Sequence, residues 1–222
     1  MSEPPPADAD PVAFIRRETA IACPPLVPEI RLHLATEITP IWQATETTLL
    51  REGLPPPYWA FAWPGGQALA RTILDDPAIV RAKRVLDFAA GSGLVAIACA
   101  KAGAGSVIAA EIDRFAAAAI ALNASLNEVT VTVTLEDLVG EIGPWDLVLA
   151  GDVCYERPMA ERITAWLRRL VAGGTEVMIG DPGRSYLPKS GLVEVARHRV
   201  PTSLELEDKT ERETVIWRLL AG

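Results

Sequence analysis

The segment RVLDFAAGSGLVAIACAKAGAGSVIAAEID, residues 84–113, constrains the fold more than any other part of the chain. An apolar run leads into Asp87, and Gly91 and Gly93 then form a turn whose backbone can approach a ligand closely. The residues that follow predict an alanine-rich helix and a second strand, which ends at Glu111. An acid at that position can accept hydrogen bonds from two ribose hydroxyls, so the unit is typical of a site for a nucleoside-containing cofactor.

The acid before the glycine turn bears on which cofactor is bound. Gly91, Gly93 and Ala96 fit the loose dinucleotide spacing G-x-G-x-x-G/A, so a nicotinamide enzyme is one alternative, and a turn that binds no ligand is another. Asp87 disfavours a dinucleotide, because a carboxylate at the mouth of the turn would repel a pyrophosphate. S-adenosylmethionine has no phosphate, and its amino group and sulfonium are cationic. The order of Asp87, the glycines and Glu111 resembles Rossmann-like methyltransferases, so we expect S-adenosylmethionine as the cofactor.

Strand and helix patterns alternate along the rest of the chain. Helices are predicted at residues 10–20, 39–50, 94–102, 114–126, 156–171 and 187–196, and another begins at Gln67. After the first strand, which leads into Asp87, and an earlier short strand at 29–35, further strands are predicted at residues 106–110, 129–135, 145–150, 175–179, 200–206 and 214–220. This order predicts an α/β fold, the Rossmann-like seven-strand methyltransferase fold, with a mostly parallel, doubly wound sheet and a C-terminal antiparallel hairpin.

The composition predicts one domain with an N-terminal extension. Residues 1–9 are acidic and proline-rich, which is typical of a disordered leader. We expect residues 10–57 to form a helical and strand extension and residues 58–222 to form the methyltransferase domain. Half of the 222 residues are apolar, which is enough for a sizeable core.

Charge and cysteine content restrict the partners and the compartment. The net charge is −8 and the arginines are interleaved with acids, so we expect no nucleic acid partner and favour a basic protein surface. No apolar run is long enough to span a membrane, and the first residues lack the layout of a secretory or mitochondrial signal. Three cysteines at unrelated spacings predict neither a disulfide framework nor a metal site. We expect a cytoplasmic monomer.

An aromatic segment precedes the glycine unit. Tyr58, Trp59, Phe61 and Trp63 lie within six residues. We interpret Trp59 as part of the core. Trp63 is followed by a Pro-Gly-Gly turn, and an aromatic ring at such a loop can stack on adenine or face a cation. We therefore expect Trp63 and Gly65 at the cofactor site.

Ligands of such sheets bind beyond the carboxyl ends of the strands. Asp137 and Leu138 follow the third strand of the repeated units, where the acid can accept a hydrogen bond from the adenine amino group and the leucine can cover the ring. Asp152 and Tyr155 follow the fourth, which abuts the first where the strand order reverses, so we expect them at the methyl acceptor. For a lysine acceptor, Asp152 would orient the amine while Tyr155 walls it against water, with help from Trp63 or Phe61. The predicted cofactor contacts are Trp63, Gly65, Asp87, Ala89, Gly91, Gly93, Glu111, Asp137 and Leu138.

Two of these motifs resemble one family. Asp152-Val153-Cys154-Tyr155 resembles the Asp-x-x-Tyr motif of the seven-β-strand protein lysine methyltransferases. PYWAFAWPGGQAL, residues 57–69, is similar to the block that marks the electron transfer flavoprotein β-subunit lysine methyltransferases within that group, and GDPGR, residues 180–184, is also similar. The resemblance extends from about residue 28 to the C-terminus. It implies methylation of lysine side chains on a folded protein, with the electron transfer flavoprotein β-subunit as substrate and with Asp152 and Tyr155 at the acceptor.

Other functions stay open at this point. The animal members of the family work in mitochondria, and the absence of a recognisable transit peptide is a departure from them. Because loops build the acceptor pocket, the acceptor could instead be a ribosomal protein or a small molecule. A dehydrogenase is disfavoured, since no residue is placed as an acid or base for hydride transfer. A non-catalytic adenosine-binding scaffold is also possible, although Asp152 and Tyr155 beside a complete cofactor loop weigh against it.

Overall fold

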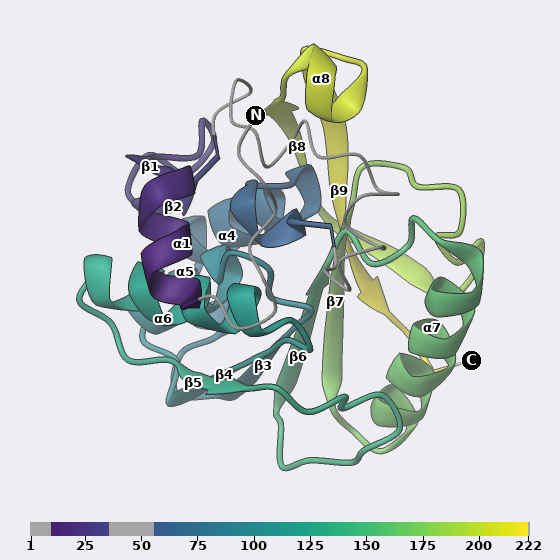
Figure 1. Ribbon diagram of the computed structural model, residues 1–222. Coiled ribbons are helices and arrows are strands. Elements are labelled where there is room, and N and C mark those ends of the chain that lie inside the picture. Colours follow the sequence, from purple (N-terminus) through teal and green to yellow (C-terminus); the bar gives the residue numbers. More distant parts are fainter. Residues whose placement is uncertain (1–9, 36–55, 222) are drawn as a thin grey trace.

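The centre of the molecule is a seven-stranded sheet with the order β5-β4-β3-β6-β7-β9-β8 (Figure 1). The computed structural model describes residues 10–35 and 56–221. The sheet strands are β3 (Arg84–Phe88), β4 (Ser106–Ala110), β5 (Thr132–Thr134), β6 (Leu147–Gly151), β7 (Glu176–Asp181), β8 (Leu192–Pro201) and β9 (Glu211–Leu219). Neighbours from β5 to β7 pair in parallel, whereas β9 runs antiparallel to both β7 and β8. The predicted fold class is confirmed.

Helices cover both faces of this sheet (Figure 1). One face carries α4 (Pro64–Asp75), α5 (Leu94–Lys101) and α6 (Arg114–Leu126), and the other carries α7 (Arg157–Ala172). Successive residues of a central strand enter different cores: Leu147 and Leu149 of β6 pack with α4 and α5, whereas Val148 and Ala150 pack with α7. Burial on both faces explains why the strand sequences are nearly continuous apolar runs.

The described part of the N-terminal extension packs on α6. It contains α1 (Pro11–Glu18) and a small antiparallel sheet of β1 (Ala20–Ala22) and β2 (Leu32–Leu34). The rings of Phe14 and Phe115 meet edge to face at 5.3 Å, and the backbone N–H of His33 donates to Asn123 Oδ1 at 2.8 Å.

Several predictions about the N-terminal region are not tested by these contacts. The predicted leader at 1–9 and the predicted helix at 39–50 lie outside the described residues. The predicted division between an extension and a methyltransferase domain stays a prediction. Within residues 10–35 and 56–221, no helix is long and apolar enough to cross a membrane.

The helix predicted at residues 187–196 is wrong. The strand predicted at 200–206 is displaced, since only Val200 and Pro201 of that range belong to a strand, but its antiparallel pairing with the last strand is confirmed. That region forms β8, which begins at Leu192 and ends at Pro201, and a one-turn helix α8 (Leu204–Glu207) follows it. β8 lies at the edge of the sheet with most of its side chains partly or fully exposed, and its pairing with β9 is irregular between Glu194 and Ala196. An exposed and irregular edge strand lacks the strict alternation that identifies a half-buried strand. Two 3₁₀ turns, η1 (Tyr58–Ala60) and η2 (Pro77–Ile79), complete the described elements.

Candidate active site

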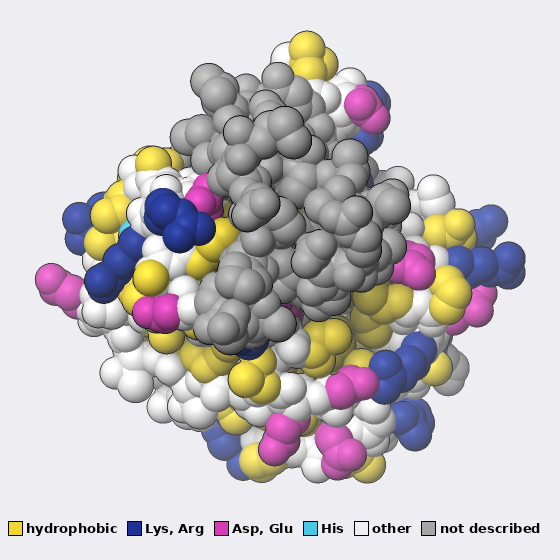
Figure 2. Space-filling model, in the orientation of Figure 1, with side chains coloured by type: hydrophobic (Ala, Val, Ile, Leu, Met, Phe, Trp, Pro, Cys, Tyr) yellow, Lys and Arg dark blue, Asp and Glu magenta, His cyan; other side chains and the backbone are white. Residues whose placement is uncertain are grey.

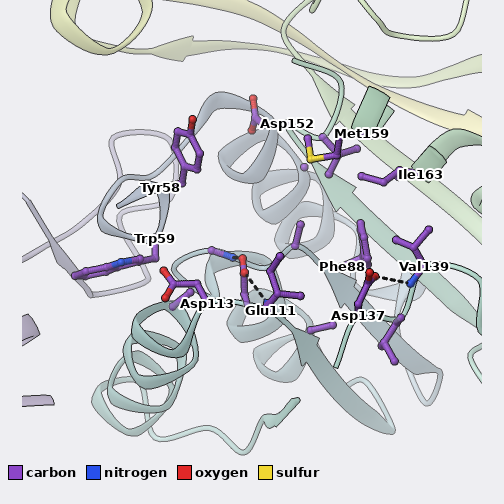
Figure 3. Close-up of a pocket in the computed structure, with 18 of the residues that line it drawn as sticks. Tyr58, Trp59, Phe88, Glu111, Asp113, Asp137, Val139, Asp152, Met159 and Ile163 are labelled. Atoms are coloured by element: carbon purple, nitrogen blue, oxygen red, sulfur yellow. Dashed lines mark hydrogen bonds between the residues drawn. The ribbon is translucent and has the colours of Figure 1, made fainter. Parts of the chain in front are cut away.

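A cavity of about 470 Å³ opens beyond the carboxyl ends of β3, β4 and β6 (Figure 3). β3 lies between β4 and β6, so the cavity sits where the strand order reverses, as expected for ligands of such sheets. Its described lining comprises Pro56, Tyr58, Trp59, Trp63, Phe88, Ala89, Gly91, Ala110, Glu111, Ile112, Asp113, Ala116, Glu136, Asp137, Leu138, Val139, Gly151, Asp152, Val153, Tyr155, Met159, Arg162, Ile163 and Arg184. Most of the predicted site residues are therefore brought together in one cavity.

Three predicted contact residues are buried and are not among the described residues that line the cavity. The described lining does not include Asp87, Gly65 or Gly93. The Asp87 carboxylate accepts a hydrogen bond from the backbone N–H of Ala96 at 2.8 Å, in the first turn of α5. Burial raises the pKa of Asp87 to about 8. Asp87 thus anchors the helix that follows the glycine turn, and its direct contact with a cofactor stays a prediction.

The glycine turn itself reaches the cavity. Ala89 and Gly91 line it with φ angles of +54° and +53°, and Gly93 adopts +78° immediately before α5. Left-handed backbone of this kind is most accessible to glycine, so the turn explains the glycines at 91 and 93. Ala89 adopts the same region with a side chain, which places strain beside the cavity.

Glu111 projects into the cavity from the end of β4. Its Oε1 accepts from the backbone N–H of Gly91 at 2.7 Å, and its Oε2 accepts from Ile112 at 3.2 Å (Figure 3). Burial raises the pKa of Glu111, and the nearby Asp113 charge adds to that rise, because the backbone donors of Gly91, Ile112 and Asp113 compensate only part of the lost hydration. The carboxylate joins β4 to the glycine turn across the cavity wall.

Asp137 and Leu138 lie on the α7 side of the same cavity. Leu138 is buried, whereas about half of the Asp137 side chain is exposed. Asp137 is paired with Arg162 at 2.7 Å and accepts from the backbone N–H of Val139 at 3.0 Å. These bonds lower the pKa of Asp137, with the Arg162 bond as the largest cause. An adenine amino group would have to share this carboxylate with Arg162.

Asp152 faces the cavity from the end of β6. Its Oδ2 accepts from the backbone N–H of Gly66 at 3.1 Å, in the first turn of α4, and its Oδ1 lies 3.4 Å from an Arg184 nitrogen. Burial raises the pKa of Asp152 to about 7, although Arg184 and the Gly66 N–H oppose that shift. Its backbone is left-handed, with φ +56°, a conformation outside the β region, so β6 ends at the preceding residue, Gly151. Because its pKa is about 7, Asp152 changes protonation state near neutral pH.

Glycines allow α4 to come close enough for that bond. A Cβ at Gly65 would lie 2.2 Å from the carbonyl oxygen of Gly180 and 2.5 Å from Asp152 Oδ2. A Cβ at Gly151 would lie 3.0 Å from the Gly66 nitrogen. The Pro-Gly-Gly turn predicted to contact the cofactor through Gly65 thus has a steric role that the structure makes visible: it lets the start of α4 touch the ends of β6 and β7.

Aromatic rings form the rim beside Asp152. The rings of Tyr155 and Tyr58 lie 5.7 Å apart, and those of Tyr58 and Trp63 lie 5.9 Å apart. Trp63 Nε1 donates to the carbonyl oxygen of Tyr58 at 2.8 Å, which fixes the indole. Burial raises the pKa of Tyr155 to about 12, so its hydroxyl stays protonated at neutral pH. Trp59 is 3% exposed, as expected of a core residue, yet it also contributes to the lining of the cavity.

Several lining residues were not identified from the sequence. Met159 and Ile163 come from α7 and complete the apolar side, and Arg184 comes from the loop after β7. The helical spacing of Met159 and Ile163 was a usable signal, because residues four apart share a helix face. Arg184 had only its place in the Gly-Asp-Pro-Gly-Arg segment after a strand. Phe61, one candidate for the acceptor wall, is 5% exposed and is not part of the described lining.

Comparison with known proteins places this site in a class. Residues 69–179 match the family model described as ribosomal protein L11 methyltransferase (PrmA). The crystal structure of magnesium protoporphyrin IX methyltransferase from Synechocystis with bound SAM shares the fold at a TM-score of 0.53 and 14% identity, over 97% of this chain and all of that one. With the cavity at the switch point of the sheet, these matches define the protein as a Rossmann-like, S-adenosylmethionine-dependent methyltransferase.

Closer relatives specify the family. The electron transfer flavoprotein beta subunit lysine methyltransferase of Xenopus laevis is 42% identical over 91% of this chain and 82% of its own length. The proteins of the same name from Danio rerio and Homo sapiens are 37% and 40% identical, covering 87% and 78% of this chain and 76% and 66% of their own lengths. The chain belongs to the family of electron transfer flavoprotein β-subunit lysine methyltransferases.

Proposed function

We propose that the protein transfers the methyl group of S-adenosylmethionine to a lysine side chain of the electron transfer flavoprotein β-subunit. The observation that carries this proposal is the placement of Glu111 and Asp152 on the wall of one cavity, with an aromatic rim beside the second acid. The names of the relatives supply the substrate.

The residues of the cavity suit a cationic nucleoside. Burial raises the pKa values of Glu111, Asp113 and Asp152, so an incoming positive charge would be stabilised by acids that are poorly hydrated before it arrives. When bound, S-adenosylmethionine supplies an electrophilic methyl group on its sulfonium. Glu111 would accept bonds from the ribose hydroxyls, Leu138 would cover the adenine, and Gly91 would let the backbone approach the methionine portion.

Asp152 and the aromatic rim would handle the lysine. At pH 7 a free lysine with a pKa of about 10.4 is neutral only about once in two to three thousand molecules, a cost of roughly 4–5 kcal/mol. The Asp152 carboxylate would accept a hydrogen bond from the amine and aim its lone pair, while Tyr155 and Trp63 exclude water that would otherwise solvate the ammonium. Asp152 acts here by orientation, because its pKa of about 7 is far below that of lysine.

The surface supports a protein acceptor better than a nucleic acid. The net charge is −8, and on the described atoms of one face the Lys and Arg side chains are dispersed among acidic and apolar ones (Figure 2). Tyr58 and Tyr155 are 43% and 44% exposed at the cavity rim, where a protein segment bearing the lysine could rest on them.

The test is methyl transfer from labelled S-adenosylmethionine to purified electron transfer flavoprotein, followed by mass spectrometry of the labelled peptide. We expect the label on a β-subunit lysine, and a lysine-to-arginine series should remove it at the modified position. Ribosomal protein L11 is the matched alternative acceptor, because the family model carries that description. Label on L11 alone would move the proposal to a ribosomal substrate, and label on RNA would exclude a lysine acceptor.

We also propose that the protein works as a monomer in the cytoplasm. The described cysteines are free, with Cys99 and Cys154 buried and Cys23 exposed, which suits a reducing compartment. Light scattering on the purified protein, with and without the electron transfer flavoprotein, tests the oligomeric state.

A further inference from the structure

A partly buried ion-pair network extends from Asp152 to α8, in the connection between β8 and β9, and to the start of β9. Arg184 Nη2 lies 3.4 Å from Asp152 Oδ1, and the same guanidinium contacts both carboxylate oxygens of Glu207, with Nη1 to Oε2 at 3.1 Å and a shorter contact from Nη2 to Oε1. Glu207, in α8, is 3% exposed. Arg212 of β9 also holds Glu207, through Nε at 3.0 Å to Oε2 and Nη2 at 2.8 Å to the backbone carbonyl.

The loop that carries Arg184 is fixed at its base. Asp181, the last residue of β7, accepts from the backbone N–H groups of Gly183 and Arg184, both at 2.7 Å. Arg184 is therefore positioned from two directions: by the loop at the end of β7 and by Glu207 from a segment about twenty residues further along the chain. This arrangement leaves the guanidinium closer to Glu207 than to Asp152.

Charges of both signs face Asp152. Burial is the largest influence on its pKa and raises it, and Asp181 and Glu207 act in the same direction. Arg184 and the backbone N–H of Gly66 oppose them. Without the guanidinium, the carboxylate would keep one neutral donor and two acidic neighbours, and its protonated form would dominate at neutral pH.

We propose that Arg184, held by Glu207, is a positioning residue that favours the ionised form of the Asp152 carboxylate and keeps it aimed into the cavity. The ion pair with Glu207 also keeps the guanidinium from approaching Asp152 more closely. Asp152 Oδ1 is therefore only weakly paired and remains able to accept a hydrogen bond from the amine of the substrate. The inference rests on the proposed function, because it assigns Asp152 to the acceptor.

The pH dependence of Arg184→Met tests this inference. Removing the guanidinium should raise the pKa of Asp152, and at a fixed neutral pH a rise of about 1 in that pKa reduces the ionised fraction by up to tenfold. Because the pKa of Asp152 is about 7, a rise of about 1 lowers its ionised fraction at pH 7 from about one half to about one eleventh. We therefore expect kcat at pH 7 to fall about fivefold, and the ratio of variant to wild-type kcat to recover toward pH 9 as Asp152 ionises. Dividing by the wild-type rate cancels the titration of the substrate lysine. Arg184→Lys, which keeps a cation, should retain more activity than Arg184→Met at neutral pH.

Two controls separate positioning from a structural role. Arg212→Met removes a partner of Glu207 that is not itself in the ion pair with Asp152. The ratio of its kcat to the wild-type kcat should therefore be closer to 1 and should not change with pH. In an Asp152→Asn background, Arg184→Met should cause little further loss, because the group on which it acts is gone. Thermal unfolding and the affinity for S-adenosylhomocysteine confirm that each variant is folded.

The outcomes distinguish this inference from the proposed function. If the wild-type protein methylates no lysine, the proposed function fails. If the wild type is active but the Arg184→Met ratio is constant with pH, or if the loss is equally large in the Asp152→Asn background, Arg184 does not act through Asp152 and the inference is overturned.

Discussion

The carboxylates at and near the cavity have different hydrogen-bond partners. Asp87 is buried beneath the glycine turn and holds the first turn of α5, whereas Glu111 reaches over the same turn from β4. Asp152 lies on another strand, with one oxygen on α4 and the other beside Arg184. The environment decides whether a carboxylate anchors the backbone or contacts a ligand, so we expect a different effect from the substitution of each acid.

Glu111→Ala should weaken cofactor binding. Loss of the proposed ribose bonds to a charged acceptor corresponds to roughly 1.5–3 kcal/mol, or about 10- to 150-fold in Kd. Turnover at saturating cofactor should change less. Calorimetric titration with S-adenosylhomocysteine measures the affinity, and Glu161→Ala, an exposed acid on α7, is the matched control. A large loss of turnover with unchanged affinity would move Glu111 from the ribose to the chemistry.

Asp152→Ala should have the opposite effect to Glu111→Ala, on turnover instead of on cofactor binding. We expect nearly intact cofactor affinity and a fall in kcat of about 100-fold, the scale of a misplaced reacting group. Tyr155→Phe should be milder than Tyr155→Ala if the ring, and not the hydroxyl, excludes water. Single-turnover methylation of the identified lysine measures both effects. Wild-type rates for Asp152→Ala would contradict the acceptor assignment.

Residue-level patterns predicted three acids of the cavity, Glu111, Asp137 and Asp152, but not Asp113 or Glu136, and not the partners of these acids. Glu111, Asp137, Asp152 and Tyr155 follow strands whose ends converge, so sequence position was informative. Arg184 lies between Asp152 and Glu207, which comes from α8, twenty-three residues further along the chain. Long-range ion pairs of this kind leave no periodic signal in a single sequence.

At the scale of elements, close contact between α4 and the ends of β6 and β7 forms the acceptor side. The sequence pattern identified the aromatic segment and the Pro-Gly-Gly turn, but placed the helix start at Gln67 instead of Pro64. Gly65 and Gly66 therefore belong to the first turn of α4, where Gly66 offers a free N–H to Asp152. The mistaken helix at 187–196 has a related cause: the position of an element at the sheet edge, and not its local propensity, decided its structure.

Gly65→Ala should separate these elements, whereas Gly66→Ala should not. A Cβ at Gly65 would meet backbone of β7 at 2.2 Å, so we expect a loss of about 1–3 kcal/mol in unfolding free energy and lower kcat. A Cβ at Gly66 would meet only Val95 Cγ2 at 3.9 Å, and alanine there can add up to about 1 kcal/mol of helix stability. Urea unfolding and methyl transfer on both variants measure the contrast. Equal behaviour of the two alanines would contradict the steric role of Gly65.

At the scale of the whole molecule, several acids with raised pKa values gather at one end of the sheet. Burial is the largest cause for Asp87 and Asp152, whose pKa values rise to about 8 and about 7, and burial also raises those of Glu111, Asp113 and Asp181. In the unfolded chain such groups ionise near pH 4. Between about pH 5 and pH 8 the folded protein therefore binds more protons than the unfolded chain does.

The cofactor-free protein should consequently lose stability as pH rises through that window. The unfolding free energy changes with pH in proportion to the protons bound by the unfolded state minus those bound by the folded state, which is negative here. Asp87→Asn should reduce the slope of unfolding free energy against pH by up to about 1.4 kcal/mol per pH unit, the limit for one titrating group. Asp146→Asn is the control, because the exposed Arg84 pair lowers the pKa of Asp146, so its contribution is lost only at acid pH. Urea midpoints across pH 5–8 provide the measurement, and a cationic cofactor should reduce the slope by favouring the ionised acids. If the wild-type profile is flat, or if Asp87→Asn leaves its slope unchanged, these acids are not held protonated by the fold.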